Sequence, residues 1–228
     1  MTMHTVDPLG DGVSAVQYVA HMGDDLFVLN RARRSMNRAS ERLTASGARL
    51  LRFCAEHDHW TPFAHPQVTL AIRMPIVVVR EWRTHTVGFV RSEASRRDVT
   101  DAPQFYRNTL RNAVSADERR ATHARSATTT HALHDRFTPW LDEQDRDALQ
   151  LYAAMIREGV APESARWHLP QSMYVEFDET ASLAAYARLY KLRDAPDAMH
   201  EIACYARAVG ELIAPLFPVS WPLLTHRA

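Results

Sequence analysis

The sequence has few cysteines, almost no lysine and no long apolar run. Its 228 residues include two cysteines, Cys54 and Cys204, which excludes a disulfide framework and a four-thiolate zinc site. The apolar segment 76–79 ends at Arg80, whereas a membrane span needs roughly 18–20 apolar residues. The first residues lack the basic-then-apolar order of a signal peptide. We therefore expect a cytoplasmic protein with no membrane segment.

Glycine and proline, at 7 and 12 residues, are too few for a low-complexity chain. Hydrophobic residues make up 46% and charged residues 24%, as in ordinary globular proteins. The length suits one substantial domain, and no linker or repeat divides the chain. We predict a single domain over residues 1–228.

Lys191 is the only lysine, so 26 of the 27 basic residues are arginine. Acidic residues also number 27, and the resulting formal charge of zero argues against a nucleic-acid-binding protein. Codon bias from a GC-rich genome explains the arginines without any function. In either case, a bound anion would meet guanidinium groups, which suit phosphate.

The apolar pattern predicts helices and two strands. Val68, Leu70, Ile72 and Met74 alternate with less apolar residues, which is typical of a half-buried strand over 67–74. Residues 171–177 form a second candidate strand, and the polar stretch 112–134 a mobile excursion. Helices are predicted over residues 24–37, 40–57, 76–85, 142–158, 162–170, 182–192 and 196–214. These elements indicate an α+β fold.

Three clusters carry candidate chemistry. His57, His59 and His65 suggest a metal site, a structural turn or a ligand-facing loop, although their spacing straddles Pro62 and matches no recognised ligand pattern. Residues 80–98 hold five arginines among serines, threonines and Glu93, either an anion site or a solvated, ion-paired helix. Within residues 166–193, Arg166 and Arg193 are two further candidates, each a weak signal alone. The clustered arginines are Arg80, Arg83, Arg91, Arg96, Arg97, Arg166 and Arg193.

The order of these clusters resembles the flavin-dependent thymidylate synthases (ThyX). The resemblance runs in register from Gly23 to Leu224. It is carried by His-Trp-Thr-Pro-Phe-Ala-His at 59–65, Arg-Met-Pro-Ile at 73–76, Arg-Glu-Trp at 80–82, Ser-Glu-Ala-Ser-Arg-Arg at 92–97, Gly-Val-Ala-Pro-Glu-Ser-Ala-Arg-Trp-His-Leu-Pro-Gln-Ser-Met-Tyr at 159–174, Ser-Leu-Ala-Ala-Tyr-Ala-Arg-Leu-Tyr-Lys-Leu-Arg at 182–193 and Phe-Pro-Val-Ser-Trp at 217–221.

The resemblance implies an α+β fold, with a central antiparallel sheet flanked by helices, in a homotetramer with shared active sites. It also implies FAD, NADPH and methylenetetrahydrofolate as cofactors for methylating uracil C5 of a uridine nucleotide, with no metal. Arg193 matches the arginine that activates the uracil. The implied substrate-binding residues are Glu81, Thr84, Glu93, Ser95, Arg97, Arg166 and Arg193. The implied cofactor-binding residues are His59, Thr61, Thr84, His85, Thr86, Glu93, Ser182, Leu183, Ala184 and Arg188.

Several positions depart from the family's signature. Thr84-His85-Thr86 stands where Arg-His-Arg is usual, and other departures are Glu81, Ser92, Asp98, Asp197 and Met199. Changes near the sugar and phosphate motif with Arg193 retained suggest an enzyme that admits a ribose hydroxyl. The sequence therefore resembles the UMP/dUMP C5-methylases of nucleoside-antibiotic biosynthesis. An ordinary dUMP-to-dTMP synthase and a non-catalytic nucleotide-binding paralogue are the alternatives.

Overall fold

The computed structural model describes residues 4–95, 101–113, 126–129 and 131–226. The chain divides into two compact units. The first unit contains Met1–Ile72, Trp82–Ser92 and Phe177–Ala228, and the second contains Arg73–Glu81 and Glu93–Glu176. The interpretation of the chain as one domain stays a prediction.

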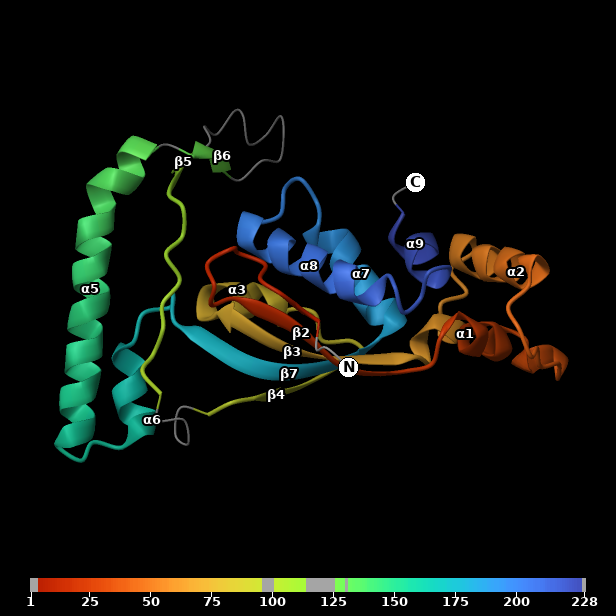
Figure 1. The fold of residues 1–228 in the computed structure, drawn as a ribbon, viewed down its shortest axis with the longest axis horizontal. Helices are drawn as coiled ribbons and strands as arrows, with labels where there is room; N and C mark the ends of the chain where they lie inside the picture. Colours follow the sequence, from red (N-terminus) through yellow and green to blue (C-terminus); the bar gives the residue numbers. More distant parts are fainter. Residues whose placement is uncertain (1–3, 96–100, 114–125, 130, 227–228) are drawn as a thin grey trace. The chain divides into compact units, whose positions relative to one another are not determined.

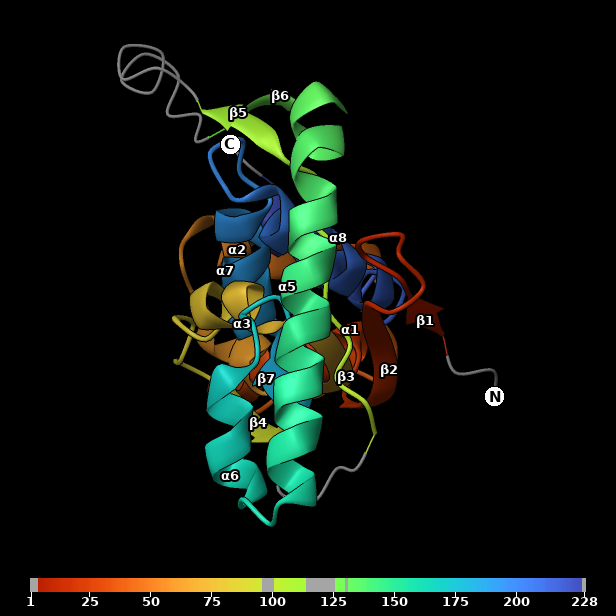
Figure 2. The same ribbon diagram turned by 90° about the vertical axis from the view of Figure 1, so that its left-hand side faces the viewer.

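A five-stranded sheet runs in the order β1-β2-β3-β7-β4, and Figure 2 shows its last four strands side by side. β1 and β2 pair antiparallel, with Val6 opposite Val16. The apolar residues of β3 are buried and alternate with half-buried neighbours, which confirms the predicted period of two. The strands are β1 (Thr5–Val6), β2 (Ala15–Met22), β3 (Gln67–Pro75), β4 (Phe89–Glu93) and β7 (Tyr174–Ser182).

Three helices of the first unit begin at residues suited to capping. Asp24, Thr44 and Ser182 each accept a hydrogen bond from the backbone N–H three residues further on, at the starts of α1, α2 and α7. α8 packs against α7 and β2 (Figure 1). Trp82, Tyr186, Tyr205 and Phe217 are buried in the core. The elements are α1 (Asp25–Ala32), η1 (Arg34–Met36), α2 (Ala45–Glu56), η2 (Thr61–Ala64), α7 (Leu183–Arg193), α8 (His200–Ile213) and α9 (Ser220–Thr225).

The second unit contains a long helix and a short two-stranded sheet. Arg107 donates hydrogen bonds to Asp142 and Asp145 of the long helix, at 2.6 and 2.7 Å. Arg73 forms an ion pair with Glu176 at 3.2 Å. The elements are α3 (Ile76–Trp82, whose last residue belongs to the first unit), β5 (Arg111–Ala113), β6 (Ser126–Thr129), α5 (His131–Arg157), α6 (Pro162–Ala165) and η3 (Arg166–His168).

The observed elements agree in kind with most of the predicted ones, and three differences stand out. α5 begins at His131 instead of 142, and β7 extends to Ser182 instead of ending at 177. β1, β2, β4, β5, β6 and α9 were not predicted. Part of the predicted excursion over 112–134 lies outside the described residues. No helix in the described part of the chain has both the length and the hydropathy to cross a membrane.

Candidate functional site

The loop Thr84–Gly88, between α3 and β4, is hydrogen-bonded to α7 of the first unit. Arg188 Nη2 donates to the carbonyl oxygen of Val87 at 2.8 Å. Gly88 has a φ of +84°, and a Cβ built at this position would lie 3.1 Å from the Cβ of Ala185. A residue with a side chain would therefore be strained here, both by its backbone conformation and by the close approach of α7.

Arg193, the last residue of α7, holds the other end of this loop. Its Nε donates to Nε2 of His85 at 2.8 Å, and its Nη2 donates to the hydroxyl oxygen of Thr84 at 3.0 Å. A cation at the C-terminus of a helix is also favoured by the helix dipole. Three residues predicted to serve the site, Thr84, His85 and Arg193, are thus brought into direct contact.

His85 is a neutral hydrogen-bond acceptor in this arrangement. Burial, and after it the charges of Arg193, Arg91 and Arg188, together lower the pKa of its imidazole to about 4. Because Arg193 Nε can only donate, His85 Nε2 must be unprotonated, which places the ring proton on Nδ1. The geometry therefore assigns one tautomer to His85 at neutral pH.

The stability of the protein should depend on the protonation of His85. The unfolded chain binds this proton with a pKa near 6.5 and the folded protein with a pKa of about 4. The contribution of neutral His85 is therefore complete above pH 6.5 and is lost as the pH falls toward 4. We expect the thermal midpoint of the wild type to fall, relative to that of His85→Gln, as the pH is lowered through this range. Parallel curves for the two proteins would contradict the assignment.

The buried carboxylate of Glu179 contacts the residues on either side of the same loop. Glu179 on β7 is fully buried, and its carboxylate accepts hydrogen bonds from Trp82 Nε1 at 3.1 and 3.2 Å and from Arg91 Nε at 2.5 Å. Burial raises the pKa of this carboxyl, and the charge of Arg91 opposes the rise. Trp82 precedes the loop and Arg91 follows it on β4, so Glu179 ties both ends of the loop to the sheet.

Glu179 was not among the predicted site residues. A single sequence gives no sign that a glutamate in a strand is buried, because acidic residues usually lie at the surface. Arg91 was noticed only as one member of an arginine cluster. Its Nη2 is buried and has no hydrogen-bond partner among the described residues, which marks a place for an acceptor.

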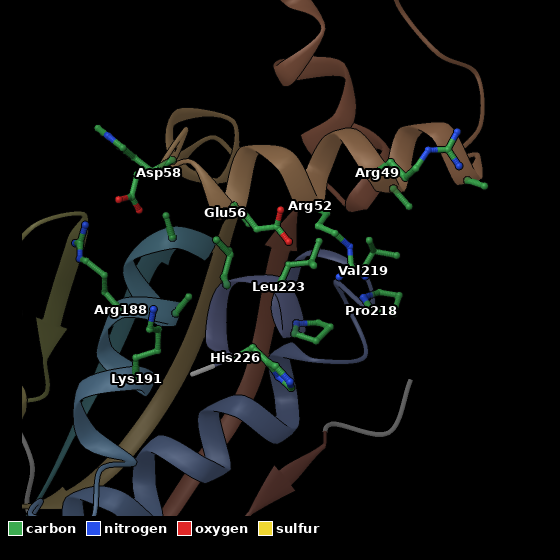
Figure 3. A pocket seen from close by; sticks show the side chains of 18 residues that line it. Arg49, Arg52, Glu56, Asp58, Arg188, Lys191, Pro218, Val219, Leu223 and His226 are labelled. Atoms are coloured by element: carbon green, nitrogen blue, oxygen red, sulfur yellow. The ribbon is translucent and has the colours of Figure 1, made fainter. Parts of the chain in front are cut away.

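A cavity of about 1400 Å³ lies in the first unit, between α2, α7 and α9. Figure 3 shows Arg188 and Lys191 on α7, and Arg49 and Arg52 on α2 across the cavity. These four cations outnumber the two carboxylates of the lining, Glu56 and Asp58. Ala184, Ala187 and Leu223 supply apolar surface. A volume of this size exceeds that of most small-ligand sites and suits an extended anionic ligand.

His59 and Thr61, predicted to contact the flavin, line a second cavity of about 410 Å³ in the same unit. Asp58 and Trp60 line both cavities. His57 stacks on Phe53 with ring centroids 4.1 Å apart. No group of three metal-ligating side chains was found in the described part of the chain. A flavin contact by His59 or Thr61 stays a prediction.

The remaining predicted cofactor residues differ in exposure. Ala184 and Arg188 line the larger cavity, and Thr86 is exposed in the loop. Ser182 and Leu183 are buried. The Ser182 hydroxyl caps α7 by accepting from Ala185 N at 3.2 Å. A flavin contact by Ser182 or Leu183 stays a prediction.

The other predicted substrate residues belong to the second unit. Glu81 is half-buried on α3, Glu93 is exposed at the end of β4, and Ser95 follows it. Arg166 is exposed where α6 meets η3. Arg97 lies outside the described residues.

Fold and site together define a broad class of protein. An arginine held by two hydrogen bonds ends a helix whose flank lines a large basic cavity. Fixed guanidinium groups beside apolar surface are typical of proteins that bind anionic ligands carrying a ring system.

Sequence comparison identifies the particular family. The pattern of the family described as "thymidylate synthase complementing protein" matches residues 17–219. The chain belongs to this family, the flavin-dependent thymidylate synthases, and is an enzyme of the type that methylates uridylate at C5.

Relatives and solved structures agree with this assignment. The flavin-dependent thymidylate synthase of Thermus thermophilus is 29% identical over 206 residues, which are 90% of this chain and 73% of that protein. The enzyme of Thermosipho africanus is 28% identical over 204 residues, covering 89% and 87%. The fold is similar to the UMP/dUMP methylase PolB from Streptomyces cacaoi bound with 5-Br dUMP, with a TM-score of 0.80, 26% identity and coverage of 92% of this chain and 94% of that chain.

Proposed function

We propose that this enzyme methylates C5 of the uracil in UMP, dUMP or both. The observation that carries the proposal is the anchored guanidinium of Arg193, in a fold similar to that of a UMP/dUMP methylase. Uracil C5 becomes nucleophilic when negative charge grows along the N3–O4 edge of the ring. A fixed cation at that edge stabilises this charge and lowers the barrier.

Further residues bind the nucleotide in this proposal. Ser95, Arg97 and Arg166 hold the phosphate, because guanidinium and hydroxyl groups suit its oxygens. Glu93 serves the sugar or a ring N–H, since a carboxylate would repel phosphate. Glu81 completes the substrate residues that the family resemblance implies, and Thr84, implied with it, serves the nucleotide through its hydrogen bond with Arg193.

FAD is the cofactor that the larger cavity would take. Its cationic residues suit a diphosphate, and its apolar wall suits a ring system. Arg188 and Ala184 would hold FAD from α7, with His59 and Thr61 in the adjoining cavity. When bound and reduced by NADPH, FAD supplies the reducing equivalents that turn the carbon of methylenetetrahydrofolate into a methyl group. We further propose a homotetramer with shared active sites and a role in nucleoside-antibiotic biosynthesis.

The proposal is tested by a competition between UMP and dUMP with FAD, NADPH and methylenetetrahydrofolate. We expect mass spectrometry to find a product about 14 mass units heavier than UMP, because a methyl group replaces one hydrogen. A corresponding product should form from dUMP if both nucleotides are accepted. Methylation of dUMP alone would show an ordinary thymidylate synthase, which the relatives from Thermus and Thermosipho favour.

The same assay separates the third alternative. A protein that binds flavin and nucleotide but forms no product with either substrate would be a non-catalytic paralogue. A reaction without NADPH is the control, because the yellow colour of an active flavoenzyme should bleach only when NADPH is added. A colourless protein that takes up no FAD would overturn the proposal.

A further inference from the structure

The two contacts of Arg193 fix more than its position. Nε and Nη2 donate to His85 and Thr84, respectively, so the guanidinium is held at two points instead of one. Since the group is planar, two anchors set the direction of its plane as well as the place of its charge. One anchor alone would leave the plane able to turn about the remaining hydrogen bond.

The two anchors differ in what they contribute. His85 is half-buried, and its Nε2 is a rigid acceptor on an aromatic ring. Thr84 is exposed, and its hydroxyl oxygen accepts a hydrogen bond from Arg193 Nη2. The sequence separations are 108 residues for His85 and 109 for Thr84, so neither contact follows from local chain geometry.

We propose that Thr84 is a positioning residue, whose hydroxyl oxygen, together with His85 Nε2, sets the plane of the Arg193 guanidinium. This inference rests on the proposed role of Arg193 at the uracil N3–O4 edge. Thr84 then acts through Arg193 and affects the stabilisation of charge on the ring more than the affinity for the nucleotide. A serine at this position would serve as well, and a valine of the same shape would not, because it has no acceptor.

The positioning role of Thr84 is tested by 19F NMR of bound 5-fluoro-UMP, with 5-fluoro-dUMP measured in parallel. The holoenzyme is used without methylenetetrahydrofolate, so that no turnover occurs. The fluorine lies on C5, and its chemical shift follows ionisation at N3. We expect wild type and Thr84→Ser to lower the N3 pKa of the bound ligand equally. Thr84→Val should bring this pKa back toward that of the free ligand and reduce kcat about tenfold, with KM nearly unchanged.

The outcomes distinguish this inference from the proposed function. If Thr84→Val lowers the N3 pKa as far as wild type does, Thr84 does not position Arg193, and only this inference is wrong. If wild type itself leaves the N3 pKa of both bound ligands unchanged, the role of Arg193 is wrong as well. Because Thr84 is exposed, neither variant should unfold the protein. Thr84→Ala removes the same acceptor and replaces Thr84→Val in the same comparison should that variant not fold.

Discussion

Replacing Arg193 by alanine is expected to lower kcat by about a hundred- to a thousand-fold, the effect of removing one preorganised donor from developing negative charge. The guanidinium lies at the end of α7 and is directed by Thr84 and His85, so its removal takes away a charge fixed in place. The flavin content of the purified protein should not change, because Arg193 is not among the residues that line either described cavity. Steady-state kinetics and the absorbance of bound flavin measure the two quantities.

Two further variants separate charge from geometry. Arg193→Lys keeps a positive charge but loses the planar fork, and it should recover only part of the lost rate. Arg146→Ala removes an exposed arginine of α5 that belongs to neither cavity, and its kcat should match wild type. A near-normal rate for Arg193→Ala would show that charge at the uracil edge is stabilised by another group.

The sequence predicted the elements whose signals are local. β3 alternates cleanly, and α7 begins with a serine cap followed by good helix formers, so both were placed correctly. β7 was ended too early, because Asp178 and Glu179 are residues that strands usually avoid. Glu179 is tolerated in β7 by partners 88 and 97 residues away in sequence, Arg91 and Trp82. The start of α5 was missed because Pro139, which normally breaks a helix, lies inside it.

The same distinction applies to the candidate site. Resemblance named Thr84, His85 and Arg193 one by one, but each was assigned to a ligand. That they contact one another depends on the packing of the loop on α7, including the close approach at Gly88, which no local pattern in the sequence expresses. The basic cavity likewise combines residues of α2, α7 and α9 that are separated by more of the chain than any motif spans.

The cluster of Glu179 with Trp82 and Arg91 should contribute strongly to the stability of the first unit. Glu179→Met replaces the carboxylate by an apolar side chain of similar length and leaves the charge of Arg91 and the indole N–H of Trp82 without their partner. Removing one member of a buried ion pair destabilises a protein by about 3–5 kcal/mol. We expect a loss of this size in the free energy of unfolding, measured in urea. Asp194→Asn, in the more exposed ion pair with Arg207, should cost about 1 kcal/mol or less.

The double variant Glu179→Met, Arg91→Met decides whether an unpaired charge causes this loss. Removing Arg91 as well takes away the uncompensated cation, so the double variant should be more stable than Glu179→Met, by about 2 kcal/mol. A deficit of about 1–3 kcal/mol relative to wild type should remain, because Trp82 Nε1 still lacks an acceptor. If the losses of the two single variants simply add, the carboxylate and the guanidinium do not stabilise each other, and Glu179 acts through packing alone.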